Sequence, residues 1–266
     1  MLDLCTGTGC IPLLFHHELY AIRNDIDLRA VGIDISEKAL HLAAHNLNQV
    51  RKEKSWVAKG SIGYMKGDVL ANPFREVRSD QIHVSTVLRY AGLPHLWDIV
   101  ISNPPYISPK AYWKTTTRSV RIFEPKLALV PPSQSSNGSM EQGDTFYMPI
   151  LRLASDVEAK IVLLEVADLD QAIRIAHAAR EMNAFDGIEI WRDQPDELQI
   201  ESPLVEGFSV LGQGNARSVV CWRGAGATWL AKNSQPRAAD SSGLRCAPLV
   251  ADNIIRLKWK HVRIMT

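Results

Sequence analysis

The sequence predicts an α/β fold in which a doubly wound, mostly parallel sheet carries helices on both faces. Two observations lead to this prediction. Short apolar runs rich in β-branched residues alternate with amphipathic helical segments through most of the chain. In addition, Gly7 and Gly9 stand where the first strand turns into the first helix, and ligands of open α/β sheets bind at that edge.

The elements are assigned from the spacing of their apolar residues. Strands are expected near residues 2–4, 28–33, 62–65, 97–102, 160–166, 185–191 and 218–222. Helices are expected at residues 10–22, 37–50, 145–156 and 169–182. Ser36 is well placed to cap the second of these helices, because a serine hydroxyl accepts from a free amide of the first turn.

The domain organisation follows from composition. Residues 1–223 are expected to form one domain, with insertions at about 70–96, which lacks a clear period, and about 131–142, which is rich in Pro, Ser and Gly. Residues 224–266 are expected to form a basic, poorly ordered tail. Only a short strand segment follows Met1, whereas strands usually run about five or six residues, so we expect a truncated first strand.

The overall charge points to no particular class of partner. The 266 residues are 46% hydrophobic and 22% charged, with a net charge of +1. Residues 224–266 hold seven Lys/Arg and two Asp, which gives +5 and leaves the preceding chain at −4.

The four cysteines form no C-x-x-C pair, so we expect free thiols and no metal site. No apolar run approaches the roughly 20 residues of a membrane span.

The glycine-rich loop after the first strand predicts a cofactor site. Glycines let the backbone pass close to a ligand, because no Cβ stands in the way. A dinucleotide site would need a third glycine where Pro12 stands, which disfavours a pyrophosphate ligand. A ligand without phosphates, such as S-adenosyl-L-methionine, does not need that glycine. The loop residues expected to bind it are Asp3, Cys5, Thr6, Gly7, Thr8 and Gly9.

Two further acidic residues follow the second and third strands. Asp34 ends the second strand, and its two oxygens could accept hydrogen bonds from both hydroxyls of a ribose. Asp68 leaves the third strand and is expected to contact the adenine amino group, with Val69 beside the ring. A glycine loop followed by carboxylates on two successive strands fits S-adenosyl-L-methionine.

A second constellation, Asn103-Pro104-Pro105-Tyr106, directly follows the fourth strand. The two prolines fix their own backbone torsions and remove two N–H donors. The Asn103 side-chain oxygen and a proline carbonyl could then accept both N–H groups of an –NH2 on a planar system, and Tyr106 offers a ring for stacking. These four residues are the predicted catalytic set, and Asn103 is also expected to lie at the cofactor.

This arrangement suits methylation of a planar nitrogen. The lone pair of such a nitrogen is conjugated and therefore weakly nucleophilic. Accepting both N–H bonds polarises the group and aims the lone pair at a methyl donor, so catalysis is mainly positioning. The tetrapeptide indicates the type of acceptor group and leaves protein and nucleic-acid substrates both open.

Several segments carry a resemblance to a known group. Residues 3–9, 34–36, 67–68 and 101–107 resemble the class I S-adenosylmethionine-dependent methyltransferases that modify amino nitrogens. Phe123-Glu124-Pro125 with Ala128-Leu129, and the later Gly143-Asp144 with Phe146-Tyr147, resemble the release factor glutamine N5-methyltransferases. The resemblance extends to about residue 223. Cys5 stands where that family usually has glycine, and the family's N-terminal helical domain is absent from this sequence.

The resemblance implies a Rossmann-like, seven-stranded methyltransferase sheet whose last strand is antiparallel. It implies transfer of a methyl group from S-adenosyl-L-methionine to a glutamine side-chain amide of a peptide chain release factor. It also implies a mitochondrial location in a eukaryote and a cytoplasmic one otherwise. A further expectation is that the basic tail contacts the ribosome or nucleic acid.

Two other hypotheses stay open on the sequence alone. The tetrapeptide is shared with N6-adenine methyltransferases of DNA or RNA, although residues 1–223 lack the strong basic face that such enzymes usually bring. The short first strand also allows an inactive fragment or a binding protein that keeps the fold without turnover.

Overall fold

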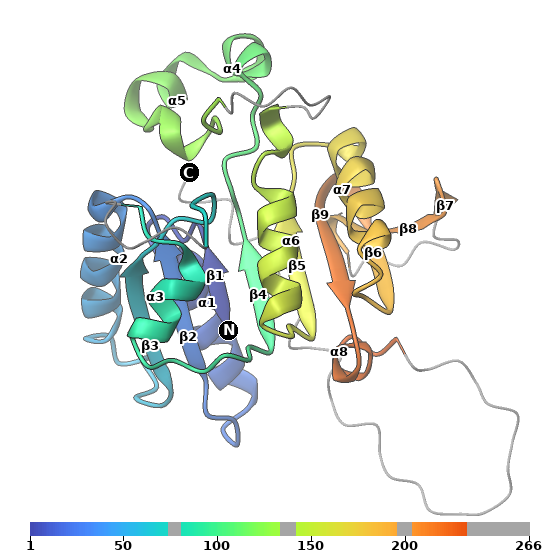
Figure 1. The fold of residues 1–266 in the computed structure, drawn as a ribbon. Coiled ribbons are helices and arrows are strands. Elements are labelled where there is room, and N and C mark those ends of the chain that lie inside the picture. The colour runs from blue at the N-terminus through green and yellow to red at the C-terminus, as the bar shows by residue number, and fades with distance from the viewer. Residues whose placement is uncertain (74–80, 134–141, 196–203, 233–266) are drawn as a thin grey trace, which may run out of the picture.

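The computed structural model describes residues 1–73, 81–133, 142–195 and 204–232 (Figure 1). Its strands are β1 Leu2–Leu4, β2 Arg29–Asp34, β3 Ser61–Lys66, β4 Ile99–Ser102, β5 Ile161–Glu165, β6 Gly187–Gln194, β7 Leu204–Val205, β8 Phe208–Leu211 and β9 Gln213–Trp222. Its α-helices are α1 Cys10–Ile22, α2 Glu37–Val50, α3 Val84–Tyr90, α4 Pro109–Thr115, α5 Arg118–Phe123, α6 Tyr147–Asp156, α7 Leu169–Glu181 and α8 Ala225–Trp229.

The strands form one mixed sheet. In the described part of the chain its order is β3-β2-β1-β4-β5-β9-β6-β8-β7. The strands from β3 to β5 in this order pair in parallel, and β9 enters antiparallel between β5 and β6. The predicted mostly parallel, Rossmann-like sheet with an antiparallel last strand is confirmed, although the described sheet has nine strands rather than seven. The short pair β7 and β8 extends it at one edge, and the sequence analysis did not foresee that pair.

Helices cover both faces of the sheet, as the alternation of elements predicts. One core layer holds α3, α6 and α7 against the sheet, with Tyr147, Ile150 and Leu151 of α6 fully buried. The other layer holds α1, α2 and α8, with Phe15 and Leu19 of α1 buried. Central strands are therefore apolar on both sides, which explains why they read as continuous apolar runs rather than as alternating ones.

The first predicted insertion contains structure of its own. Asp68 bridges to His83, and α3 begins directly after that bridge. Residues 74–80 of this insertion lie outside the described residues, as do 134–141 of the second insertion. Between the two insertions, α4 and α5 were not predicted, because seven and six residues are too few to show a clear helical period.

The predicted tail does not begin as an irregular segment. Its first residues form α8, and a Cβ on Gly226 would lie only 2.1 Å from the carbonyl oxygen of Lys160. The start of this segment therefore packs on the amino end of β5, which corrects the expectation for residues 224–232. The rest of the predicted tail, 233–266, lies outside the described residues, and so does its expected contact with ribosome or nucleic acid. None of the helices described is long and apolar enough to cross a membrane.

Cys5 occupies a backbone conformation that favours glycine. Its φ is +60°, in the left-handed region, at the point where β1 gives way to the loop. A side chain in this region costs about 1–2 kcal/mol, because Cβ approaches the following carbonyl oxygen. The cysteine therefore places local strain at the start of the predicted cofactor loop.

We expect Cys5→Gly to be more stable than Cys5→Ala by about 1 kcal/mol, since both remove the thiol and only glycine relieves the left-handed strain. The free energy of unfolding, measured by urea titration, checks this comparison. Equal stability of the two variants would contradict the assignment of strain to Cys5.

Candidate functional site

Parallel pairing brings the predicted site residues to one edge of the sheet. Asp3 of β1 is in register with Gly32 of β2 and with Ile101 of β4. The three strands therefore end side by side, and their following segments start from neighbouring positions. The amide of Thr6 donates to the carbonyl oxygen of Ile33 at 3.0 Å, which ties the loop after β1 to the end of β2.

Tyr64 of β3 packs against the glycine loop at Gly9. Gly9 has a φ of +76°, and the Tyr64 hydroxyl donates to its carbonyl oxygen at 3.3 Å. A Cβ on Gly9 would lie 2.4 Å from the Tyr64 hydroxyl oxygen. Glycine is thus required here by packing as well as by torsion. Sequence reasoning missed Tyr64, because a tyrosine inside a strand gives no signal of which loop it will touch.

The Asp34 carboxylate holds the glycine loop in place and can still accept further hydrogen bonds. One carboxylate oxygen accepts from the Gly7 amide at 2.8 Å, and the other accepts from the Ser36 amide at 2.8 Å. Each oxygen of a carboxylate has two lone pairs, so each could accept one more hydrogen bond. Asp34 therefore holds the glycine loop against β2 and still fits the pair of hydroxyls expected of a ribose.

Asp3 is a buried carboxyl with an unused oxygen. Thr6 donates to its Oδ2 at 2.5 Å, while Oδ1 is buried and has no hydrogen-bond partner among the described residues. Burial raises the pKa of Asp3 to about 7, with Asp34 nearby adding to the effect and the Thr6 hydrogen bond opposing it. A buried acceptor without a donor is costly. It fits a cationic group such as the ammonium of an amino-acid ligand.

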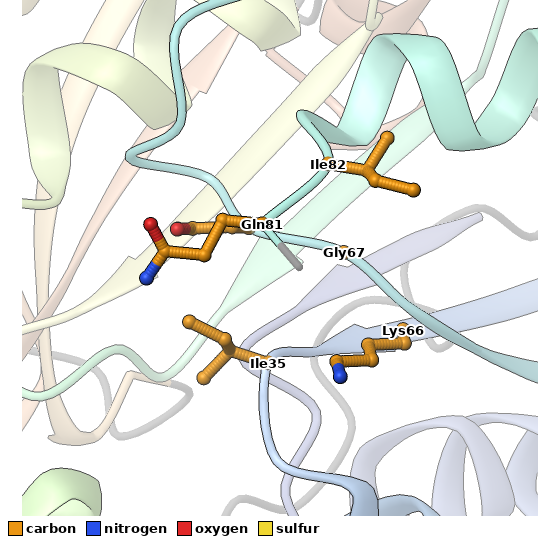
Figure 2. A pocket seen from close by; sticks show the side chains of 6 residues that line it. Ile35, Lys66, Gly67, Gln81 and Ile82 are labelled. Carbon is orange, nitrogen blue, oxygen red and sulfur yellow. The ribbon is translucent and has the colours of Figure 1, made fainter. Parts of the chain in front are cut away.

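A small pocket lies where β2 and β3 end. It is lined by Ile35, Lys66, Gly67, Asp68, Gln81 and Ile82. Its cavity volume of about 60 Å³ is small for a ligand site. Figure 2 shows Ile35 on the side of β2, with Gln81 and Ile82 across from it. Apolar walls beside a carboxylate suit a flat ring with an exocyclic amino group, which is the chemistry expected at Asp68.

The structure does not bring Val69 to this pocket. Val69 is 5% exposed and packs in the core layer of α3, α6 and α7. The chain turns at Asp68, whose carboxylate accepts from the Leu70 amide at 2.8 Å, so the next side chain points away from the pocket lining. Ile35 and Ile82 supply the apolar walls instead. Ile82 escaped sequence reasoning because it lies in a region without a clear period.

The remaining loop residues take structural positions. The Thr8 hydroxyl lies 3.1 Å from the Cys10 sulfur. The backbone carbonyl oxygen of Thr8 accepts a hydrogen bond from the side chain of Asn46 in α2 at 3.0 Å. Burial raises the pKa of the Cys5 thiol far above its ordinary value, with the carboxylates of Asp34 and Asp3 adding to the effect. Cys5 is therefore a neutral thiol at the loop rather than a nucleophile.

Asn103, Pro104, Pro105 and Tyr106 leave β4 next to this loop. Ser102 ties the two together, because its hydroxyl donates to the carbonyl oxygen of Leu4 at 2.7 Å. The prolines are buried, Asn103 is partly exposed, and the Asn103 side chain makes no hydrogen bond to another described residue. The amide of Asn103 is thus free to accept or donate towards a bound molecule.

Tyr106 is held by a residue that the sequence analysis did not assign to the site. Its hydroxyl donates to Glu165, at the end of β5, at 3.3 Å. Burial, with Glu165 adding to it, raises the pKa of the Tyr106 hydroxyl well above its ordinary value. Burial likewise raises the pKa of Glu165, while Tyr106 and Arg217 oppose that shift. The hydrogen bond orients the Tyr106 ring at the site.

Gln171 of α7 links the end of the tetrapeptide to two other segments. Its side-chain nitrogen, Nε2, lies 3.4 Å from the carbonyl oxygen of Tyr106 and 3.2 Å from the carbonyl oxygen of Gly143. The same nitrogen lies 2.9 Å from Asp144 Oδ1. Its amide oxygen accepts from the Ala167 amide at 2.8 Å. Gln171 is 3% exposed, so these bonds form in a site with little water.

Asp144 completes this network. Arg174 donates to both of its carboxylate oxygens, at 2.7 and 3.1 Å, while Asp144 itself is 5% exposed. A bidentate pair of this kind adds geometric precision as well as energy. Asp144 belongs to a segment that carries the resemblance, but its contacts with Gln171 and Arg174 join residues far apart in sequence. Within the described part of the chain, no cluster of three His, Cys, Asp or Glu side chains could hold a metal ion.

Several curated relatives of the chain are named as glutamine methyltransferases. The chain is 31% identical over 177 residues to a protein of Schizosaccharomyces pombe described as "Probable MRF1 mitochondrial N(5)-glutamine methyltransferase mtq1". The match covers 65% of this chain and 49% of that protein. The chain resembles the glutamine N5-methyltransferases. It is also 27% identical over 197 residues to the release factor glutamine methyltransferase of Thermodesulfovibrio yellowstonii, covering 73% of this chain and 54% of the relative.

The chain thus spans about half the length of these two relatives. No family model matches the sequence. Among solved structures, the catalytic domain of human Mettl16 in complex with an RNA hairpin has a TM-score of 0.44 and 13% identity, over 83% of this chain and 62% of that one.

We expect Asp3→Asn to remove a pH dependence of stability. A carboxyl whose pKa is raised from 3.8 to about 7 binds more protons in the folded state. The free energy of unfolding therefore falls as pH rises from about 4 to about 7 in the parent chain. Urea titrations across that range should show a flatter profile for Asp3→Asn.

The same substitution should weaken binding of S-adenosyl-L-methionine by about tenfold or more at pH 8, because it removes a charge-assisted contact with the ligand's ammonium. Calorimetry measures this affinity. Asp25→Asn serves as a control, since Asp25 is an exposed carboxylate distant in sequence and paired with Arg23. Unchanged affinity in Asp3→Asn would remove Asp3 from the site.

Gln171→Met should lower the free energy of unfolding by about 2–3 kcal/mol, because it leaves several buried polar groups without a partner. Gln49→Met, on the exposed side of α2, should change it by less than about 0.5 kcal/mol. Urea titration of both variants tests whether Gln171 is the centre of the network.

Proposed function

We propose that this chain transfers a methyl group from S-adenosyl-L-methionine to the side-chain amide nitrogen of a glutamine in a peptide chain release factor. The observation that carries the proposal is the unengaged amide of Asn103, which leaves β4 beside the glycine loop and is followed by two prolines without N–H donors. The names of the relatives, which are glutamine methyltransferases, favour this acceptor.

The residues present fit the cofactor. We assign the ammonium of its amino-acid end to the free oxygen of Asp3, the ribose hydroxyls to Asp34, and the adenine ring to the pocket of Ile35, Asp68 and Ile82. Gly7, where an added Cβ would meet nothing within 4 Å, lets the backbone lie close to it. When bound, S-adenosyl-L-methionine supplies a methyl group on a positively charged sulfur.

The residues of this chain then hold the glutamine amide for in-line transfer. The Asn103 side-chain oxygen accepts one N–H of the substrate amide, and the carbonyl oxygen of Pro104 accepts the other. Tyr106, held by Glu165, packs against the plane of the amide. The lone pair of the nitrogen is turned towards the methyl donor. Because the nitrogen becomes acidic once it is methylated, no strong base is needed in advance.

The site of action is proposed from the relatives' names. Two yeast relatives are named as mitochondrial MRF1 N(5)-glutamine methyltransferases, and other relatives are named as release factor glutamine methyltransferases. We therefore propose a mitochondrial release factor as substrate if the source is eukaryotic, and a cytoplasmic one otherwise. We also propose that the basic residues 233–266 contact the ribosome or nucleic acid.

Asn103→Ala should lower kcat for methyl transfer to a release factor by about 100-fold or more, since it removes an acceptor that orients the reacting group. Binding of S-adenosyl-L-methionine should weaken only a few-fold. Transfer of radiolabelled methyl groups and calorimetry measure the two quantities.

Asn46→Ala is the matched control, because Asn46 supports the Thr8 carbonyl from α2 and lies outside the tetrapeptide. It should retain most of kcat. Parallel assays with an adenine-containing oligonucleotide distinguish the substrate classes. Transfer to the oligonucleotide and not to the release factor would refute the proposal, and so would failure of the parent chain to bind S-adenosyl-L-methionine.

A further inference from the structure

A small lobe stands over the candidate site. Residues 108–128, which we call the lobe, follow the tetrapeptide and Ile107 and contain α4 and α5. The amide of Ile107 donates to the carbonyl oxygen of Leu129 at 2.9 Å, which closes the base of the lobe. Figure 1 shows α4 and α5 beyond the carboxyl ends of the parallel strands.

The lobe is ordered by local signals. The Ser108 hydroxyl accepts from the Ala111 amide at 3.2 Å, with Pro109 in the first turn, and the Thr117 hydroxyl accepts from the Val120 amide at 3.5 Å. Such caps satisfy amides that a short helix would otherwise leave free. The lobe therefore presents its side chains from two defined helices.

Large apolar side chains of the lobe face water. Of the ten large hydrophobic side chains that are exposed in the described part of the chain, four belong to these 21 residues. They are Trp113 at 66% exposure, Ile122 at 60%, Phe123 at 83% and Leu127 at 50%. No residue of α5 is buried, and Tyr112 is the one buried residue of α4. These four side chains thus add little to the core, and a concentration of exposed apolar groups marks an interaction surface.

The lobe is also strongly basic. It carries Lys110, Lys114, Arg118, Arg121 and Lys126 against a single acid, Glu124, which gives +4 in a segment of a domain whose net charge is −4. None of these five cations forms an ion pair with a residue that the structure describes. The charge is therefore available to an acidic partner.

The apolar part of the lobe distinguishes a protein partner from a nucleic acid. Nucleic acids bind by phosphate contacts and by stacking of bases on free aromatic faces. Here the Arg121 guanidinium lies 5.5 Å from the centre of the Trp113 ring, so one face of the ring is already occupied. Ile122 and Leu127 offer no stacking surface. Exposed aliphatic and aromatic groups surrounded by arginine and lysine have the composition of a protein–protein interface.

We propose that the lobe docks the protein that carries the glutamine, through a surface of that protein where acidic residues surround apolar ones. This inference rests on the proposed function and names the part of the chain that selects its substrate. Because Ile107, at the base of the lobe, directly follows Tyr106, a protein bound to the lobe is held beside the tetrapeptide. A glutamine on a loop of that protein then reaches Asn103 at high effective concentration.

Two double variants test the lobe. Ile122→Ser with Phe123→Ser removes apolar contacts, and Arg118→Glu with Arg121→Glu reverses the charge. Each should raise KM for a purified release factor by about tenfold or more with little change in kcat, since the lost binding is shared by ground and transition states. Affinity for S-adenosyl-L-methionine should stay unchanged, and so should kcat/KM for a short peptide that contains the same glutamine.

Matched controls lie elsewhere on the surface. Leu204→Ser alters a side chain that is 71% exposed on β7, and Lys54→Glu reverses an exposed charge after α2. Both should leave KM for the release factor unchanged. The peptide assay and the cofactor affinity also show that the lobe variants remain folded.

Failure of the two proposals can be told apart. If the parent chain transfers no methyl group to the release factor, the proposed function fails, and the lobe is then judged by calorimetric binding of the release factor to parent and variants. An unchanged KM in the assay, or unchanged or absent binding in that titration, would overturn the docking role. Loss of RNA binding in the charge variant, with release factor binding intact, would overturn it in favour of a nucleic acid.

Discussion

The parallel pairing of β1 with both β2 and β4 determines where every candidate residue lies. Because Asp3 is in register with Gly32 and Ile101, the three strands end together and their loops start side by side. The Asp34 carboxylate then joins the loop after β1 to the start of α2, through the amides of Gly7 and Ser36. Without this register, the glycine loop and the Asn103 tetrapeptide would belong to separate parts of the surface.

The sequence predicted what local chemistry determines. The first helix runs from Cys10 to Ile22 as expected, Ser36 caps the second helix, and every strand except β7 and β8 lies on an apolar run that was found in the sequence. These features depend on neighbouring residues, so spacing and capping rules suffice. Asp34 and Asn103 lie at the ends of β2 and β4 as expected, since a parallel sheet collects its carboxyl ends at one edge.

What the sequence did not predict depends on contacts between distant segments. Tyr64 lies 55 residues from Gly9, Glu165 lies 59 residues from Tyr106, and Gln171 lies 65 residues from the same tyrosine. No pattern within one window connects such pairs. Val69 lies outside the lining of the pocket for a local reason, because the turn at Asp68 directs its side chain into the core and leaves Ile35 and Ile82 in the lining.

The site carries free-energy costs that a bound cofactor would offset. Asp3 is buried with one oxygen unpaired, and Cys5 is held in a left-handed conformation beside it. Both features weaken the fold, and a ligand ammonium would relieve the first by supplying the missing donor. The exposed apolar groups of the lobe are likewise left for a partner to cover. Substitutions in the lobe can then alter which protein is bound without altering methyl transfer at the edge of the sheet, since the two functions depend on different contacts.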